Sequence, residues 1–336
     1  MKKILSLVLA TLMMATVLVG CGDKDKGKDN DGKDDGKSEV ASEVKFTTGS
    51  SSGTYYAFGS VLAGQVNKVT DSNITAIEGK GSQGNIEMLQ INGAQLGFCQ
   101  SDVMSYAYNG TNLFEETGKV DNFSTVAALY MEQVQIVTCD PKIKTVADLK
   151  GKNVSIGESG SGVYYNAIDV LDAYGLTEKD IKATYEGFGE SAESLKDGKI
   201  DAAFVVAGAP TTAITELAHA KPTYLVSLDE EHVDALCEAS PYYSKYTIPK
   251  DVYNLDSDTT TVAVSAVVIA RDDVSDADVY NFLSGIFDGE NTEAITSVHA
   301  KGAELDLEFA AGVKGVPYHP GAVEFFSAKG IDVPAK

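Results

Sequence analysis

Four glycine-rich loops carry most of the side chains in this sequence that could hold a small ligand. They read Gly49-Ser50-Ser51-Ser52-Gly53-Thr54-Tyr55-Tyr56, Gly79-Lys80-Gly81-Ser82-Gln83-Gly84-Asn85, Gly157-Glu158-Ser159-Gly160-Ser161-Gly162 and Gly208-Ala209-Pro210-Thr211-Thr212. Each follows a predicted strand and opens a predicted helix, where backbone N–H groups and the helix dipole favour an anion. Glycine permits close backbone approach, and hydroxyls add donors. Four such loops predict a cradle for a small anionic or zwitterionic metabolite, although one loop alone is consistent with ordinary helix capping.

The candidate ligand-binding residues come from these loops and from the helices that follow them. Tyr55 and Tyr164 are expected to wall the ligand, while Asn85 and Asn166 offer hydrogen bonds to a carboxylate or an amino group. Lys80 could add a cation, with a solvated position as the alternative. The set is Ser50, Ser51, Gly53, Thr54, Tyr55, Ser82, Asn85, Gly160, Ser161, Gly162, Tyr164, Asn166, Gly208, Ala209, Pro210 and Thr211.

Two of the loops also match enzyme motifs. The run from Gly49 to Gly53 fits G-x-S-x-G, which would make Ser51 the nucleophile of a secreted hydrolase. That loop follows the first predicted strand, so the chain has no room upstream for the other strands of such a hydrolase. The run from Gly79 to Gly84 fits G-x-G-x-x-G, the motif of dinucleotide-binding loops. A dinucleotide cofactor is not expected outside the cell, where the amino-terminal segment, described below, places this protein. We therefore expect no catalytic residue and no cofactor, and keep the Ser51 hydrolase as an alternative.

Strands and helices are expected to alternate along the body of the chain. The first series has strands at 44–48, 74–77 and 95–99 and helices at 54–69, 85–91 and 101–108. The second has strands at 153–156, 183–185 and 201–206 and helices at 163–174 and 190–197, followed by a helix that Pro210 opens. This alternation indicates parallel sheets with helices on their faces, and ligands of open α/β sheets bind beyond the carboxyl ends of the strands.

Two longer apolar runs, 125–138 and 259–270, are expected to carry the chain between two lobes. The first run is interrupted by Glu132 and Gln133. The predicted fold is therefore α/β, with two α/β lobes joined by two crossing strands and a ligand cleft between them. We assign residues 44–135 and 265–336 to the first lobe and residues 136–264 to the second.

The amino-terminal segment indicates export. Lys2 and Lys3 precede an apolar run over 4–19, which has the length of a signal-peptide core. The run ends in Leu18-Val19-Gly20-Cys21, which resembles the lipobox of bacterial lipoproteins and implies cleavage before Cys21 and lipidation of its sulfur. A plain signal anchor is the alternative. Residues 1–20 are thus the predicted signal peptide and 21–43 a tether rich in Asp, Lys and Gly, which places the protein on the outer face of the cell membrane.

Composition excludes several classes of partner. A net charge of −22 argues against nucleic acid, which requires clustered lysine and arginine. The four cysteines and four histidines lack zinc-site spacing, and Asp29, Asp31 and Gly32 resemble a calcium loop that lacks its closing glutamate, so we expect no metal. Cys99 and Cys139 are interpreted as strand residues without a disulfide. The single arginine, Arg271, follows the second long run beside Asp272 and Asp273, where we expect a surface ion pair.

An ordered set of motifs resembles the TAXI family, the extracytoplasmic solute receptors associated with TRAP transporters. The set comprises the first loop, Gln100-Ser101-Asp102, Val146-Ala147-Asp148-Leu149-Lys150-Gly151-Lys152-Asn153-Val154-Ser155-Ile156-Gly157, Gly160-Ser161-Gly162 and Gly208-Ala209-Pro210-Thr211-Thr212-Ala213-Ile214. The resemblance covers about residues 44–329. It adds Gln100, Ser101 and Asp102 to the candidate ligand-binding residues.

This resemblance implies a type II periplasmic-binding-protein fold, TRAP membrane permease subunits as partners, and a glutamate-like or C5 dicarboxylate ligand such as 2-oxoglutarate. Members of the family often carry an arginine near the end of the strand that corresponds to 136–139, where this chain has Thr138 and Cys139. A carboxylate would then rest on N–H and hydroxyl groups. We expect a monomer. A receptor for an ABC importer and an adhesive lipoprotein remain alternatives.

Overall fold

The structure is a computed structural model that describes residues 39–112 and 114–336. The predicted signal peptide, Cys21, the calcium-like residues and the tether as far as residue 38 lie outside this part of the chain. In the described part, none of the helices is long and apolar enough to cross a membrane.

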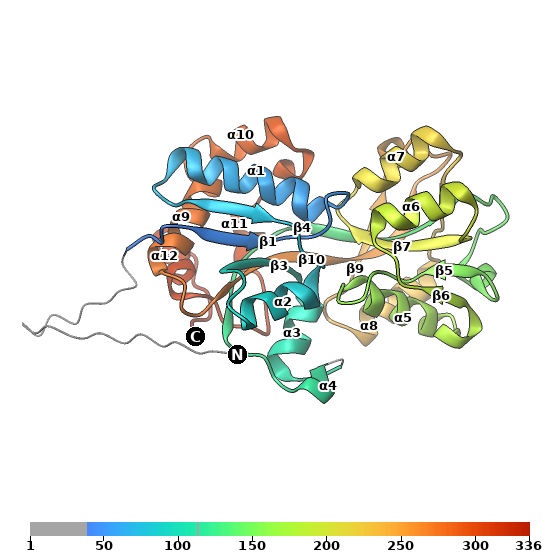
Figure 1. The fold of residues 1–336 in the computed structure, drawn as a ribbon, viewed down its shortest axis with the longest axis horizontal. Coiled ribbons are helices and arrows are strands. Elements are labelled where there is room, and N and C mark those ends of the chain that lie inside the picture. The colour runs from blue at the N-terminus through green and yellow to red at the C-terminus, as the bar shows by residue number, and fades with distance from the viewer. Residues whose placement is uncertain (1–38, 113) are drawn as a thin grey trace, which may run out of the picture. The chain divides into compact units, whose positions relative to one another are not determined.

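Within the described residues, ten strands form one sheet in the order β2-β1-β3-β10-β4-β7-β5-β6, with β8 beside β4 and β9 beside β10. Their bounds are β1 Val44–Thr47, β2 Ile74–Ile77, β3 Leu96–Gln100, β4 Phe123–Thr138, β5 Asn153–Ser155, β6 Lys182–Thr184, β7 Ala202–Ala207, β8 Tyr224–Leu225, β9 Ser244–Ile248 and β10 Thr259–Arg271. Strands β1 to β3 pair in parallel, as do β5 to β7, whereas β4 and β10 pair antiparallel with each other and with β7 and β3. The two long strands therefore lie at the centre of the sheet (Figure 1).

The helices cover both faces of this sheet. Helices α1 (Thr54–Val69), α2 (Ser82–Gln90), α3 (Ser101–Asn109), α4 (Phe114–Thr117), α9 (Asp276–Phe287), α10 (Asn291–Val298), α11 (Leu307–Ala311) and α12 (Pro320–Ala328) belong to the first lobe. Helices α5 (Val163–Ala173), α6 (Phe188–Asp197), α7 (Thr212–Ala220) and α8 (Glu230–Ala239) belong to the second. Short 3-10 helices are η1 (Val146–Leu149), η2 (Glu178–Asp180), η3 (Lys250–Val252) and η4 (Ala300–Glu304).

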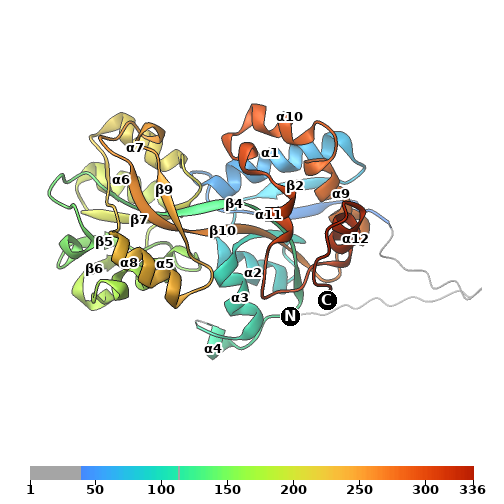
Figure 2. The same cartoon turned by 180° about the vertical axis from the view of Figure 1, so that it is seen from behind.

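Each lobe has its own apolar core. Phe46, Phe98 and Phe282 are buried in the core of the first lobe, and Val154, Val170 and Phe204 in that of the second. Both long strands contribute to both cores: Leu129 and Val267 face the first, Val134 and Val262 the second. The predicted crossing strands are thus confirmed as β4 and β10, and Figure 2 shows β10 running from one lobe into the other. The exact division at 135/136 and 264/265 stays a prediction.

The structure corrects several predicted element bounds. Helix α7 begins at Thr212, so Pro210 precedes it rather than opens it. The reason is that Thr211 is held in an extended conformation, its N–H donating to the Tyr253 hydroxyl at 2.8 Å. Helix α2 begins at Ser82 instead of residue 85, which places Asn85 in its first turn. The elements between 224 and 248, namely β8, α8 and β9, were not predicted.

Candidate functional site

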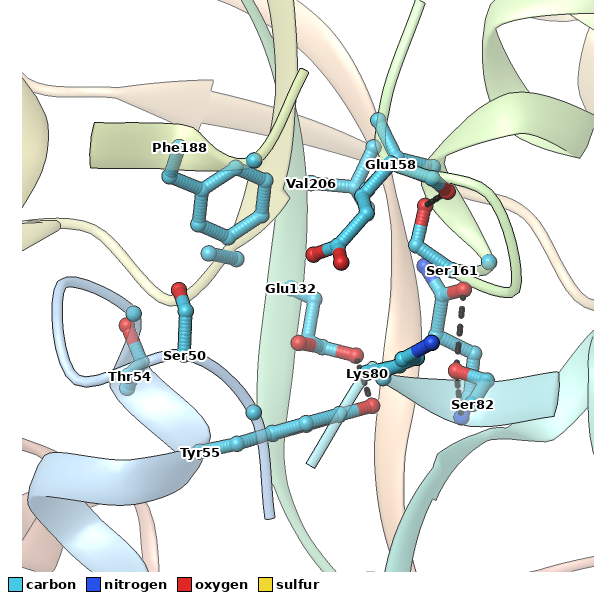
Figure 3. A pocket seen from close by; sticks show the side chains of 18 residues that line it. Ser50, Thr54, Tyr55, Lys80, Ser82, Glu132, Glu158, Ser161, Phe188 and Val206 are labelled. Carbon is cyan, nitrogen blue, oxygen red and sulfur yellow. Dashed lines mark hydrogen bonds between the residues drawn. The ribbon is translucent and has the colours of Figure 1, made fainter. Parts of the chain in front are cut away.

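A pocket lies between the two lobes where the glycine-rich loops meet. Its empty space is about 520 Å³, solvent at the mouth included. The lining residues are Gly49, Ser50, Gly53, Thr54, Tyr55, Lys80, Gly81, Ser82, Gln100, Glu132, Glu158, Ser161, Gly162, Val163, Gly187, Phe188, Val206 and Ala207. Figure 3 shows Tyr55, Lys80 and Ser82 on the first-lobe side and Phe188 and Glu158 on the second-lobe side.

The strand order explains why these loops come together. Strands β1, β2 and β5 end at Thr47, Ile77 and Ser155, and each is followed by one of the first three loops. Because the two parallel halves of the sheet direct their carboxyl ends toward each other, the loops face one another across the pocket. The fourth loop lies just beyond, since its strand β7 contributes Val206 and Ala207 to the lining.

Eight of the predicted ligand-binding residues line the pocket. They are Ser50, Gly53, Thr54, Tyr55, Ser82, Gln100, Ser161 and Gly162. Gly162 stands at a close approach between the lobes, because a Cβ on it would lie 1.3 Å from Gln100 Oε1. Its φ is −73°, so the need for glycine here comes from space and not from a left-handed backbone. Only Gly81 on the second loop combines pocket lining with a positive φ, of 89°, among the described residues.

The other predicted residues lie outside the pocket lining, and several of them fasten the scaffold. Asn85 is fully buried in the first lobe, where its Nδ2 donates to the carbonyl oxygens of Thr48 at 2.5 Å and Phe98 at 2.8 Å. These bonds hold the ends of β1 and β3 beside α2. The Tyr164 hydroxyl donates to Glu178 at 3.1 Å, away from the cleft.

Asn166 and Asp102 form part of a buried polar network between the lobes. Asn166 Nδ2 donates to Asp102 Oδ2 at 2.9 Å and to the Tyr243 hydroxyl at 2.8 Å, while its Oδ1 accepts from Gln100 Nε2 at 2.8 Å. Burial raises the pKa of Asp102 to about 6, and the hydrogen bonds from Val103 and Asn166 oppose this rise. The network orients Gln100, whose side chain reaches the pocket.

Further predicted residues form hydrogen bonds near the pocket through their backbone or side chain. The Gly208 carbonyl accepts from Thr54 Oγ1 at 2.8 Å, and the Ala209 N–H donates to Gln133 Oε1 at 2.7 Å. Thr211 Oγ1 lies 3.0 Å from Gln135 Nε2 and accepts its hydrogen bond. The remaining residues outside the lining are Ser51, Ser101, Gly160 and Pro210.

Ser51 has none of the surroundings of a nucleophile. Its side chain is exposed, and within the described residues no hydrogen bond links its hydroxyl to a histidine. The neighbouring Ser50 Oγ lies 3.2 Å from Ser52 Oγ. Among residues 39–112 and 114–336, no histidine is therefore placed as a hydrogen-bonded general base for Ser51.

Sequence reasoning missed Glu132 and Phe188 as pocket residues. Glu132 is only 2% exposed, and the Tyr55 hydroxyl donates to its Oε2 at 2.7 Å. Burial raises the pKa of Glu132 to about 8, while the hydrogen bond from Tyr55 and the charge of Lys301 oppose the rise. The one feature of the sequence that could have indicated Glu132 is that it interrupts the otherwise apolar run 125–138. Phe188 gives the pocket an apolar wall at the start of α6 (Figure 3).

Expectations about cysteine and charge can also be compared with the described residues: Cys99 lies in β3 as expected, whereas Cys139 follows the end of β4 at Thr138 and is not a strand residue. Arg271 pairs with Asp273, as expected for a surface ion pair, and its Nη1 donates to the Ala94 carbonyl at 3.2 Å. It does not line the pocket. Cys99, Cys139 and Cys237 are free thiols.

Comparison with known proteins agrees with this architecture. A model of the NMT1-like family matches residues 46–330. Among solved structures, the alkanesulfonate-binding protein SsuA of Xanthomonas axonopodis pv. citri, bound to MOPS, is 14% identical and has a TM-score of 0.50, over 87% of this chain and 92% of that one. PhnD1 of Prochlorococcus marinus, in complex with methylphosphonate, is 10% identical and has a TM-score of 0.51, over 76% and 89%.

An ancestral arginine-binding protein bound to glutamine gives a similar match. It is 14% identical and has a TM-score of 0.50, over 78% of this chain and 98% of that chain. At identities this low the likeness shows the fold alone. The α/β periplasmic-binding-protein fold predicted from the sequence is thereby confirmed.

Proposed function

This chain belongs to the NMT1-like family, and on that premise we propose that it is an extracytoplasmic solute-binding protein, not an enzyme, which captures a small polar metabolite between its lobes. The observation that carries the proposal is the pocket, which takes donors from loops of both lobes and charged side chains that lack ion-pair partners in the described residues. Such a site binds a solute well only when the lobes meet around it.

The proposed partner is the membrane part of an importer, and an ABC-type importer is the first candidate. Among proteins of the same fold, one is named for alkanesulfonate binding, one for arginine binding, and PhnD1 is in complex with methylphosphonate. We carry the binding of a small solute over to this chain. A TRAP permease is the second candidate. It is favoured by the ordered motifs, such as Gln100-Ser101-Asp102 and Gly160-Ser161-Gly162, that resemble TAXI receptors.

The proposed attachment is a lipid on Cys21, with the acidic, glycine-rich segment after it as a tether. The body would then act as a monomeric receptor beside the importer. The strongly negative net charge gives the body no attraction to anionic lipid, so the acyl group would have to supply the membrane contact.

A thermal-shift screen tests the proposal. The purified body is heated with a panel of amino acids, carboxylates, sulfonates and phosphonates. A ligand at ~100 times its dissociation constant adds about 2.7 kcal/mol to stability, which raises the melting temperature measurably. One or more compounds should do so and bind with 1:1 stoichiometry in calorimetry. A panel without any stabilising compound would contradict the proposed function.

Uptake of the stabilising compound into right-side-out membrane vesicles separates the two importers. An ABC-type importer predicts uptake that depends on ATP and survives an ionophore. Uptake that an ionophore abolishes while ATP is present would select the TRAP permease instead.

A further inference from the structure

Three charged side chains at the pocket are not paired within the described part of the chain. Glu132 lies on β4, Glu158 on the loop before α5, and Lys80 on the loop before α2. No ion pair is found for any of them among residues 39–112 and 114–336. Figure 3 shows both carboxylates pointing into the same space, with the Lys80 ammonium beside it. At pH 7 Glu158 and Lys80 present one negative and one positive charge to a ligand, and the Glu132 carboxyl can become a second negative charge when a cation pairs with it.

Glu132 is the most informative of the three because it is almost fully buried. Its Oε2 accepts from Tyr55, whereas no hydrogen bond to Oε1 is found in the described residues. Because Glu132 lines the pocket, this second oxygen is available to a ligand. A glutamine would occupy the same space, but it could not become an anion beside a bound cation. The carboxyl therefore points to a cationic group that occupies the pocket.

We propose that Glu132 and Glu158 select a ligand with a protonated amine, and that Lys80 and the loop donors hold an anionic group of the same ligand. This inference rests on the proposed function of the pocket as a solute site. The ligand class is a small zwitterion such as an amino acid, and a dicarboxylate without an amine is disfavoured. Within the described residues no group of three or more His, Cys, Asp or Glu side chains could hold a metal ion.

Binding of an amine should also displace a proton. Around the Glu132 carboxyl lie Tyr55 from α1, Tyr130 from its own strand, Asp102 from α3 and Lys301 from η4. Because its pKa is raised to about 8, the carboxyl holds its proton at pH 7 in the empty pocket. An ammonium in contact with Glu132 lowers that pKa, so the proton passes to solvent as the ligand binds. Glu158 and Lys80, which face the same pocket, modulate the size of this effect.

Calorimetry with matched pairs of compounds tests the selection. We would titrate L-glutamate against glutarate and L-alanine against propionate, at pH 7 in phosphate and in Tris, whose ionisation enthalpies differ. An amino acid should bind about ten-fold or more tightly than its counterpart, and should release up to one proton. A counterpart that binds as tightly as its amino acid would overturn the inference but leave the solute-binding proposal standing. Failure of every compound in this set and in the wider panel would contradict both.

Isosteric variants assign the effect to the two carboxylates. Glu132→Gln and Glu158→Gln should each weaken amino-acid binding about ten-fold or more, without weakening the counterpart, and Glu132→Gln should remove the buffer dependence of the heat. Glu216→Gln, on the exposed face of α7, is the matched control and should bind like the wild type. Wild-type amino-acid affinity in both pocket variants would refute the assignment. Should Glu132→Gln fail to fold, the half-buried Glu158 decides the question alone.

Discussion

Single side chains determine the charge of this pocket, and the cations Lys80 and Arg271 have different roles. Lys80 lines the pocket, whereas Arg271 is held by Asp273 and by the Ala94 carbonyl outside it. Lys80→Gln should weaken binding of an anionic group by about 1 kcal/mol, a modest value because the side chain is exposed. Arg271→Gln should leave the affinity unchanged. Calorimetry on both variants checks this, and the reverse order would mean that the site is misplaced.

The raised pKa of Glu132 predicts how the free energy of unfolding depends on pH. Its folded pKa of about 8 lies above the ordinary value of 4.5, so the folded state binds more protons than the unfolded state between these values. Its contribution to stability is fully present below pH 4.5 and is lost as the pH rises toward 8, by at most about 1.4 kcal/mol per pH unit.

Glu132→Gln should therefore gain stability relative to the wild type as the pH rises from 5 to 8, a range set by that raised pKa. Urea unfolding of both proteins at several pH values measures this difference, with Glu216→Gln as the control. A difference that stays constant across the range would show that Glu132 is already ionised in the folded state.

Among single residues, the hydrogen-bond donors of the pocket were predicted from the sequence better than its buried carboxyl group. Ser50, Thr54 and Ser82 were found because hydroxyl and glycine residues cluster in loops, a local pattern. Glu132 and Phe188 could not be found in this way, because their position at the pocket depends on long-range strand pairing that brings β4 and α6 to the same place.

Among the elements, α3 and α5 are joined by the buried network around Asn166. Asn166→Leu would leave the Asp102 carboxyl and the Gln100 amide without their shared partner. Loss of a buried partner of this kind costs about 1–3 kcal/mol, so we expect a destabilisation of that size, together with weaker ligand binding through Gln100. Urea unfolding measures it, with Gln90→Ala at the exposed end of α2 as a control that stays within about 0.5 kcal/mol. A stability equal to the wild type would show that the network is dispensable.

Element prediction succeeded where periodicity is strong and failed where tertiary contacts decide. The long apolar runs gave β4 and β10 almost to the residue, and the apolar spacing in α1 gave its bounds. The segment β8-α8-β9 has weak patterns, and β8 and β9 exist because they pair with the edges of β4 and β10. The prediction that Pro210 opens α7 was wrong because the Tyr253 hydroxyl, distant in sequence, holds Thr211 outside the helix.

In the body as a whole, hydrogen bonds join the lobes around the pocket. Gly84 N–H donates to the Gly160 carbonyl at 2.9 Å, and Thr54 Oγ1 to Gly208 O at 2.8 Å. Opening of the lobes around the pocket would break these contacts. The strands β4 and β10, whose side chains pass from one core to the other within a few residues, are the two connections about which such opening would occur.

Membrane attachment is predicted to depend on one cysteine. Replacing Cys21 by serine removes the sulfur that would carry the lipid, so the protein should appear in the medium or the soluble extracytoplasmic fraction. Fractionation followed by immunoblotting detects the change, and Cys237→Ser, in the body, is the control that should remain attached. A Cys21→Ser protein that stays with the membrane would refute the lipoprotein interpretation.

The central claim, that a solute binds between the lobes, is tested most directly at Gly162. A Cβ there would lie 1.3 Å from Gln100 Oε1 and 3.0 Å from Ser82 Oγ, so Gly162→Val must hold the lobes apart at the pocket. The measurement is a calorimetric titration of the most stabilising compound of the screen into the wild type, into Gly162→Val and into Gly64→Ala. Gly64 is the control because a Cβ there meets nothing within 4 Å. We predict unchanged binding to Gly64→Ala and a loss of about 100-fold or more, ~2.7 kcal/mol, for Gly162→Val. Wild-type affinity in a folded Gly162→Val protein would place the ligand elsewhere and contradict the account.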